Sequence, residues 1–284
     1  MVTPKPGIYP HVPFDEYLAW DALNASTMKH VGKSPAHAKV EIDYPRPPTK
    51  DTDAGDAAHC GLLEPERLHA DFAVRPTGID RRTKEGKATW AKFVAENEGK
   101  TIIETREHWD MILGMREAGK RHPVFAELVA NAKHREVSIV WEDESTGLLC
   151  KARPDLLTTY KGWTVCGDLK TTRDARPWSF ARDVASYGYH NSAAHYLDGL
   201  AALAPRERRH MIAAVEKARP FAIRIYELTD SSIEQGRQEN RVRMATWAEC
   251  LKTGIYPAYS EEIEPLEIPA YAMNYDIWVN EEVA

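Results

Sequence analysis

The feature that most constrains the fold is a change near residue 136 from helical patterns to short runs typical of strands. Residues 136–141 read EVSIVW, and residues 148–157 and 163–169 are two further runs rich in apolar side chains. Short apolar or alternating runs with β-branched residues predict strands. Turn-forming segments, DESTG at 143–147 and the stretch 158–162, separate the runs. Because the connections are short, we expect the three strands to form an antiparallel meander.

Helical patterns surround these strands. Apolar periodicity and capping residues predict helices over 51–64, 84–97, 105–132, 177–204 with a break near Gly188, and 231–253 between Asp230 and Gly254. Two more strands are predicted over 211–216 and 221–228. The order predicts an α/β fold, α+β mixed, in which helices flank a central mixed sheet.

The first 50 residues differ from the rest because prolines are concentrated there. We interpret residues 1–50 as an N-terminal arm with one short helix, which Ser26 or Ser34 caps; Pro35 suits the first helical position. Residues 51–284 form the main domain, and the whole chain is one globular unit. With 284 residues and 43% hydrophobic content, the chain is long enough to bury a sizeable core.

Charge and cysteine content narrow the functional class. The net charge is −6, so binding to nucleic acid would have to rest on local basic patches and bound cations. Four scattered cysteines, Cys60, Cys150, Cys166 and Cys250, indicate a reducing cytoplasm and are typical of small buried residues. The sequence contains no run of about 18 apolar residues and no apolar leader. We therefore expect a cytoplasmic protein without a membrane partner.

The segment with the clearest chemistry joins Arg153-Pro154-Asp155 to Asp168-Leu169-Lys170. Each aspartate is expected near the end of one of two neighbouring strands, so the two carboxylates meet at one edge of the sheet. Carboxylates held this close favour a cation between them, and hard oxygen ligands suit Mg²⁺ or Mn²⁺. The Leu169 carbonyl can also reach the metal.

Lys170 lies two residues after Asp168, so both side chains point to one face of the strand. A lysine there can orient a water or stabilise a phosphate, while the metal lowers the pKa of the attacking water. The letters alone are also compatible with two surface aspartates and a solvated lysine. The position of D-L-K directly after the apolar run WTVCG favours the site.

These residues resemble the PD-(D/E)xK nuclease superfamily and, more narrowly, the RecE-type (exodeoxyribonuclease VIII-like) exonucleases of phages and prophages. The resemblance extends over most of the chain, through the segments PGIYPHVPFDEY, AGDAAHCGLLEPE, RRTKEGKATW, GLLCKARPDLL, GDLKTT and YGYHNSAAHYLDG. It implies a restriction-endonuclease-like core, with catalytic Asp155, Asp168 and Lys170. It also implies His59 as a metal ligand beside Asp155 and Asp168; by itself, a lone histidine on a helix is more typical of a satisfied surface or core residue.

The activity that the resemblance implies is Mg²⁺-dependent degradation of linear double-stranded DNA from the 5′ end, leaving 3′ single-stranded tails for recombination. Relatives form ring-like homo-oligomers and act with a single-strand annealing recombinase in a bacterial host cell.

Candidate DNA contacts are of two kinds. Arg81, Arg82 and Lys87 belong to the densest basic run and are suited to phosphates, although a solvated loop would have the same composition. The aromatic set Tyr187, Tyr189 and His190 can line a channel or stack on a frayed base, or instead pack in the core. Tyr196 is added by the resemblance.

Two alternatives remain open. Ser192 stands where the resembled family usually has Gln, which favours a catalytically weak or inactive DNA-end-binding module as the second hypothesis. A relative with an iron–sulfur cluster would need clustered cysteines towards the C-terminus, where only Cys250 lies.

Overall fold

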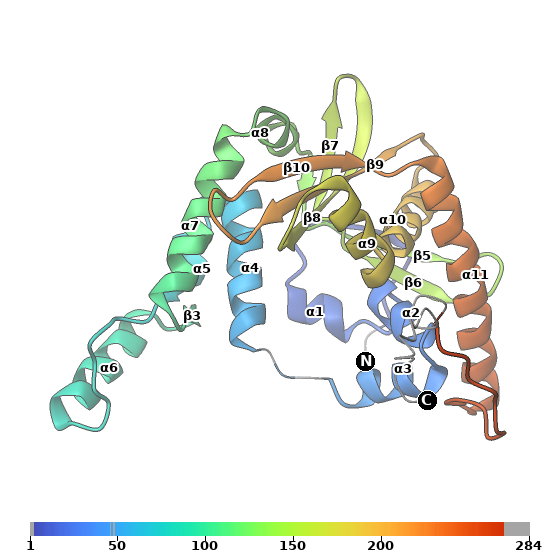
Figure 1. Cartoon of the computed structure of the whole chain (residues 1–284), viewed down its shortest axis with the longest axis horizontal. Coiled ribbons are helices and arrows are strands. Elements are labelled where there is room, and N and C mark those ends of the chain that lie inside the picture. The colour runs from blue at the N-terminus through green and yellow to red at the C-terminus, as the bar shows by residue number, and fades with distance from the viewer. Residues whose placement is uncertain (1–2, 46, 48, 270–284) are drawn as a thin grey trace, which may run out of the picture.

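The predicted strands form two sheets instead of one meander. In the computed structural model, which describes residues 3–45, 47 and 49–269, a five-stranded sheet has the order β10-β9-β8-β7-β4 (Figure 1). Its strands are β4 (His134–Arg135), β7 (Leu156–Tyr160), β8 (Trp163–Thr172), β9 (Arg209–Glu216) and β10 (Ile223–Glu227). A three-stranded sheet contains β1 (Gly7–Tyr9), β5 (Ser138–Glu142) and β6 (Leu149–Ala152). A small parallel pair is formed by β2 (Phe72–Val74) and β3 (Thr101–Ile103).

The division between the two larger sheets lies at Pro154. The predicted strand over 148–157 is wrong as a single element, because β6 ends at Ala152 and β7 begins at Leu156. Proline has no amide hydrogen and a fixed φ, so a ladder cannot continue through it. The chain therefore leaves one sheet and enters the other at this point. Asp155 consequently precedes β7, whereas we expected it near the end of a strand.

The central sheet is mixed, as predicted. Strands β7 and β8 are antiparallel, with Leu156 opposite Gly167, and β8 and β9 are parallel, with Asp168 opposite Ile212. The connection from β8 to β9 passes through α9 (Pro177–Tyr187) and α10 (Tyr189–Leu203), which are separated at Gly188. Gly188 adopts a left-handed φ of 69°, so the predicted helix break there is confirmed.

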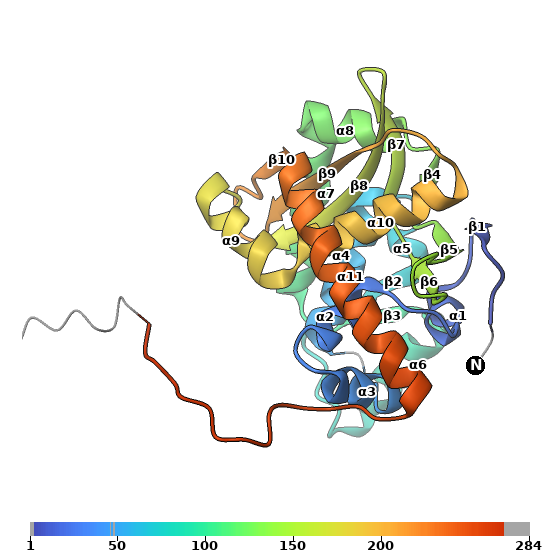
Figure 2. The ribbon, with the colours of Figure 1, turned by 90° about the vertical axis from the view of Figure 1, so that its right-hand side faces the viewer.

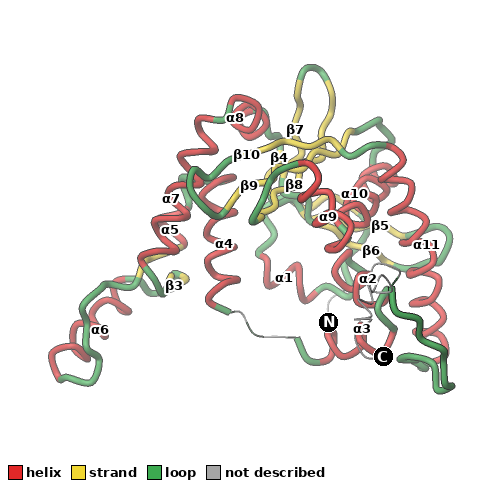
Figure 3. Tube along the Cα trace, in the orientation of Figure 1, coloured by secondary structure: helices red, strands yellow, loops and turns green. Residues whose placement is uncertain are grey.

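Helices cover both faces of the central sheet (Figures 2 and 3). One core packs α2 (Ala25–Val31), α10 and α11 (Asp230–Thr253) against β5, β6 and β8. A second core packs α4 (Lys50–Leu63) and α7 (Arg106–Arg121) against the opposite face. The remaining helices are α1 (Phe14–Ala19), α3 (Pro35–Asp43), α5 (Leu68–Asp71), α6 (Lys84–Glu96) and α8 (Pro123–Ala130).

Several helix boundaries differ from the sequence-based expectation. The helix predicted over 105–132 is two helices, because Pro123 begins α8 and the residue before a proline is disfavoured in the helical region. Thr229, not Asp230, caps α11, since its side chain accepts from the Ser232 amide. Ser34 caps α3, as one of the two alternatives predicted, whereas Asn24 and not Ser26 caps α2.

The N-terminal segment contains more structure than the one helix expected. Its described residues form β1, α1, α2 and α3, and residues such as Met28 and Ala38 are buried in the main core. Lys151 anchors α1, because its buried ammonium donates to the carbonyl oxygens of Tyr17 (2.9 Å), Leu18 (3.2 Å) and Trp20 (2.7 Å). The division into an arm at 1–50 and a domain at 51–284 stays a prediction, and its residues 1, 2, 46, 48 and 270–284 lie outside the described residues.

Within the described part of the chain, no helix is both long enough and apolar enough to cross a membrane. The four cysteines are free thiols; Cys150, Cys166 and Cys250 are buried, as the sequence predicted for small apolar residues, and Cys60 is half-buried.

Two helical glycines give a matched test of the packing. A Cβ on Gly199 of α10 would lie 2.5 Å from ring atoms of the buried Trp141, whereas a Cβ on Gly55 of α4 would meet nothing within 4 Å. We expect Gly199→Ala to lower the free energy of unfolding by about 1–3 kcal/mol through overpacking. Gly55→Ala should raise it by up to about 1 kcal/mol, because alanine is the better helix former. Denaturant unfolding of both variants measures this; equal stabilities would contradict the packing described.

Candidate functional site

The site forms where the chain crosses between the two sheets. Glu136 lies between β4 and β5, and Asp155 lies between β6 and β7. The two crossings are adjacent, since the Glu136 amide donates to the Asp155 carbonyl at 3.0 Å. Glu136 has a positive φ of 49°, an unusual conformation for a non-glycine residue that this sharp crossing requires. Both acidic side chains are thereby brought to one place.

Asp155 is tied to β8 by its side chain. Its Oδ2 accepts a hydrogen bond of 2.6 Å from the Leu169 amide, in the position where a longer β7 would supply a backbone acceptor. His59 of α4 approaches from the other side, with its Nδ1 3.9 Å from Asp155 Oδ2 and a hydrogen bond to the Leu169 backbone. Three of the predicted positions, His59, Asp155 and the Leu169 carbonyl, therefore lie together.

Asp168 and Lys170 form a close pair on β8. Their side chains point to one face, as the two-residue spacing predicts, and Lys170 Nζ lies 2.6 Å from Asp168 Oδ2. The Asp168 side chain is 3% exposed and that of Lys170 is 24% exposed. The lysine ammonium also lies 5.2 Å from the centroid of the Tyr189 ring. The Lys170 ammonium is therefore a partly accessible positive charge at the edge of the site.

Burial and mutual repulsion set the protonation of the acids. Burial, followed by the charges of Asp168 and Glu136, raises the pKa of Asp155 well above its usual range. Burial alone would raise the pKa of Asp168, but Lys170 and then His210 outweigh it and lower the pKa. Burial also raises the pKa of Glu136, against the opposing charge of Arg153, whose Nε lies 3.1 Å from Glu136 Oε2. Unlike a solvated acidic surface, this cluster stores repulsion that a cation would relieve.

The donor set fits a divalent cation. One ligand atom from each of His59, Glu136 and Asp155 lies within 4.8 Å of the other two. Burial, followed by the charge of Lys170, lowers the pKa of His59 to about 4, which keeps the ring in the neutral form that ligates metals. Two carboxylates with one imidazole suit Mg²⁺ or Mn²⁺. Asp168 lies next to this trio but directs Oδ2 to Lys170.

A cavity of about 440 Å³ opens onto these residues. It is lined by His59, Glu136 and Asp155, by Phe14 and Tyr17 of α1, and by Tyr196 of α10. Figure 1 shows α1 below the central sheet, with α4 beside it. The N-terminal helix thus supplies one wall, and the cavity provides access to the candidate metal ligands.

The predicted DNA contacts separate into two places. Tyr189 and Tyr196 lie at the site, and Tyr187, which is half exposed, stacks on Tyr189 at 5.6 Å between ring centroids. His190 instead points to α11, with its Nε2 3.5 Å from Glu239 Oε1.

The basic run lies elsewhere. Arg81, Arg82 and Lys87 belong to the segment that leads into α6 and to α6 itself, which projects away from the sheets (Figure 1). Arg82 pairs with Asp80 at 3.0 Å, and the Arg81 guanidinium lies 4.7 Å from the Trp90 centroid. These residues are not brought to the acidic cluster; as DNA contacts, they stay a prediction for a remote part of the duplex.

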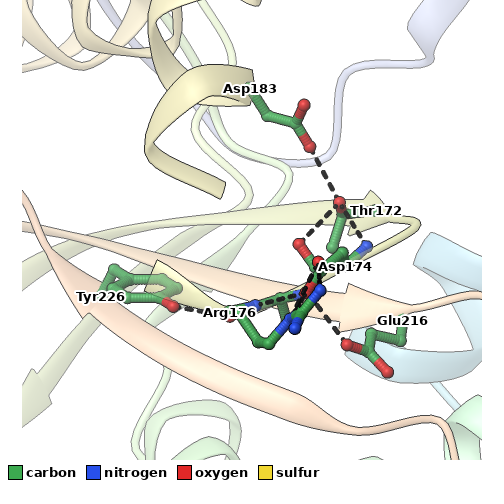
Figure 4. A network of polar contacts seen from close by, with 7 residues as sticks. Thr172, Asp174, Arg176, Asp183, Glu216 and Tyr226 are labelled. Carbon is green, nitrogen blue, oxygen red and sulfur yellow. Dashed lines mark hydrogen bonds and ion pairs between the residues drawn. The ribbon is translucent and has the colours of Figure 1, made fainter. Parts of the chain in front are cut away.

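The loop that follows Lys170 is held by a polar network (Figure 4). Thr172 Oγ1 donates to Asp183 Oδ2 at 2.9 Å and accepts from the Asp174 amide at 3.2 Å. The Ala175 amide donates to Glu216 Oε1 at 2.9 Å, and Tyr226 donates to the Ala175 carbonyl at 2.6 Å. The network joins β8, β9, β10 and α9, so it fixes the position of α9 relative to the end of β8.

Glu136 is the site residue that sequence reasoning missed. It stands at the start of the EVSIVW run, where it looks like an ordinary polar residue of an alternating strand. The available signal was its position opposite Arg153-Pro154-Asp155 in the predicted hairpin, where a proline forces a bend.

Comparison with known proteins places the chain in a family. A family model described as a PDDEXK-like domain of unknown function (DUF3799) matches residues 24–268. The chain belongs to this family. The PDDEXK-like assignment agrees with the resemblance found in the sequence, at the level of the superfamily. No curated protein matches the chain.

One solved structure supports the fold of this PDDEXK-like domain. A protein from Eubacterium rectale, described as a "putative exonuclease", is 13% identical, covers 90% of this chain and 94% of its own, and has a TM-score of 0.58. The likeness shows a mixed α/β, restriction-endonuclease-like core, as predicted. A second structure, described as SSO0001, is 15% identical over 66% of this chain and 85% of its own, with a TM-score of 0.28.

The raised pKa of Asp155 gives a stability prediction. The pKa of Asp155 is higher in the folded protein than in the unfolded chain. The contribution of Asp155 to the free energy of unfolding is therefore fully present below about pH 3.8 and is lost as the pH rises through the folded pKa. At pH 7–8, metal-free Asp155→Asn should therefore melt above the wild type by a few degrees, at about 2–4 °C per kcal/mol.

The difference should vanish near pH 4, and saturating Mn²⁺ should reverse it, because only the wild type gains binding energy. Thermal melts with and without Mn²⁺ measure both effects. Exposed Glu144→Gln, which also removes one carboxylate charge, is the control and is expected to be neutral. A metal-free variant less stable than the wild type at pH 8 would contradict the electrostatic account.

Proposed function

We propose that this PDDEXK-like domain is a divalent-metal-dependent nuclease that acts on the ends of linear duplex DNA. One observation carries the proposal: a partly buried trio of potential metal ligands lies beside the Asp168–Lys170 pair in a PDDEXK-like fold. The proposed ligands are His59, Asp155, Asp168 and the Leu169 carbonyl. Glu136 is added because of its position beside His59 and Asp155. The cofactor proposed is Mg²⁺, with Mn²⁺ as a substitute.

The residues divide the chemistry among them. A bound cation would polarise the phosphate and lower the pKa of a nearby water. Asp155 is held by the Leu169 amide in an orientation facing His59, so this carboxylate needs little reorganisation to bind a cation. Lys170, kept charged by Asp168, stabilises negative charge that develops on the phosphate. Tyr189 and Tyr196 provide aromatic and hydroxyl surface for the nucleotide beside the cut.

The finer features come from the resemblance to RecE-type exonucleases. They are 5′ to 3′ degradation, 3′ single-stranded tails, a ring-like oligomer and a single-strand annealing recombinase as partner. Each is part of the proposal and would be tested by its own assay.

The first test is hydrolysis of a linear duplex with Mg²⁺. We expect Lys170→Ala and Asp168→Asn each to lower the rate by at least about 10²-fold, because each removes a charge that acts on the transition state. Lys217→Ala, an exposed lysine just beyond β9, is the matched control and should keep the wild-type rate.

A covalently closed circle should survive while the same DNA, once linearised, is consumed. Equal rates for the wild type, Lys170→Ala and Asp168→Asn would overturn the proposed site. Cleavage of the closed circle would overturn the requirement for an end.

The second candidate function is a weak or inactive module that binds DNA ends. Ser192 favours it, because this residue lies four positions before Tyr196 on α10 and so shares a helix face with that cavity-lining tyrosine. The serine hydroxyl is short and lies 3.5 Å from the Gly188 carbonyl of its own helix. A glutamine at this position would reach further toward a bound strand.

Ser192→Gln separates the two candidate functions. If the missing amide limits catalysis, we expect the variant to hydrolyse linear duplex about 10-fold faster than the wild type, since one good hydrogen bond to a charged group is worth about 1.5–3 kcal/mol. The measurement is single-turnover nucleotide release with Mg²⁺ or Mn²⁺. End binding that survives a chelator, with no nucleotide release from either protein, would support the binding module instead.

A further inference from the structure

His210 is a buried side chain directly beside the proposed site. It lies on β9 opposite Cys166 of β8, and Asp168 follows two residues later on the same face of that strand. The residue is 2% exposed, and its ring centroid lies 6.4 Å from that of Tyr196. Asp168 and Lys170 are the charged groups whose fields act on the ring.

Neither ring nitrogen of His210 has a hydrogen-bond partner among the described residues. A buried polar group without a partner costs about 1–3 kcal/mol, so an imidazole at this position needs a reason other than packing. An apolar side chain would fill the same volume without that cost.

A polar cavity of about 390 Å³ reaches this position. It is lined by Leu197 and Arg237 from the helices and by Arg208, Arg209 and His210 from the start of β9. The space is large and polar enough to hold water, which needs two or more polar partners. The His210 ring therefore borders a cavity that can hold water and shares a sheet face with Asp168.

We propose that His210 is a positioning residue for Asp168. Its neutral ring, through one internal water, holds the Asp168 carboxylate so that one oxygen faces Lys170 and the other faces the metal. The inference rests on the proposed function, in which Asp168 binds the metal. Groups that orient ligands in this way typically change metal affinity by about 10–100-fold.

His195 provides a matched comparison. It is also 2% exposed, and burial lowers the pKa of both histidines to about 4. Unlike His210, the His195 ring has a partner, with its Nε2 3.0 Å from the Lys151 carbonyl, and it packs 4.5 Å from the Trp141 ring. One buried histidine is therefore satisfied within the fold, and the other has no partner among the described residues and lies on the sheet face that carries Asp168.

The test is Mn²⁺ binding to the full chain without DNA, measured by calorimetry, together with thermal melting. We expect His210→Leu to weaken Mn²⁺ binding about 10-fold while the metal-free melting temperature stays equal or rises. His210→Gln, which keeps a polar group, should bind within about 3-fold of the wild type. His195→Leu should melt lower, because it leaves the Lys151 carbonyl without its partner, and should bind Mn²⁺ as the wild type does.

His210→Phe serves as a second apolar variant if His210→Leu does not fold. Wild-type Mn²⁺ affinity in a folded His210→Leu or His210→Phe would overturn the positioning role and leave the proposed function intact. Equal loss in the leucine and glutamine variants would assign His210 to packing and also overturn it. A wild-type chain that binds no Mn²⁺ would overturn the proposed function and this inference together.

Discussion

The hydrogen bond from the Leu169 amide to the Asp155 carboxylate is the interaction on which the site depends. Strand β8 needs an acceptor there because β7 begins only at Leu156, after the bend at Pro154. The side chain of Asp155 replaces the missing backbone partner, and this fixes its direction. In a strand, the amide and carbonyl of one residue point to the same side, so the Leu169 carbonyl also faces the bend, where His59 reaches it. One proline thus separates the two sheets and orients the proposed ligands.

The cost of this arrangement is that acidic groups are held close together within the protein. Asp155 and Asp168 are both almost fully buried, and Glu136 lies on the adjacent crossing. Lys170 offsets the charge of Asp168, and Arg153 offsets that of Glu136. Asp155 instead accepts a hydrogen bond from a backbone amide and has no close cation among the described residues. Removing charges from water is expensive unless each is paired. The unbalanced carboxylate is therefore the position where a divalent cation gains most, which is also the position nearest His59.

How much of this was predictable depends on sequence distance. The Asp168–Lys170 pair follows from two-residue alternation, so a local pattern was sufficient. The break at Gly188 was likewise local, whereas the single strand drawn through Pro154 ignored a proline that the same rules mark as a stop. Glu136 could not be found from local pattern, because its role depends on a crossing 19 residues away in the chain from Asp155. His59 comes from another helix, and no spacing rule relates it to β8; only the family resemblance pointed to it.

For the proposed nuclease, the overall charge determines the order in which metal and DNA are expected to bind. The chain has a net charge of −6, and the cavity is lined by Glu136, Asp155, Asp56 and Glu64 as well as by Arg67 and Arg153. A DNA phosphate approaching such a surface is repelled unless cations reverse the local field. A divalent cation at the carboxylates would do so at the position that we propose for the phosphate. Metal and DNA end are therefore expected to bind cooperatively at the site, whereas the exposed arginines near α6 would attract DNA in either state. A protein that only binds DNA ends does not need metal and DNA to bind cooperatively. Binding in the presence of a chelator therefore distinguishes the two proposed functions.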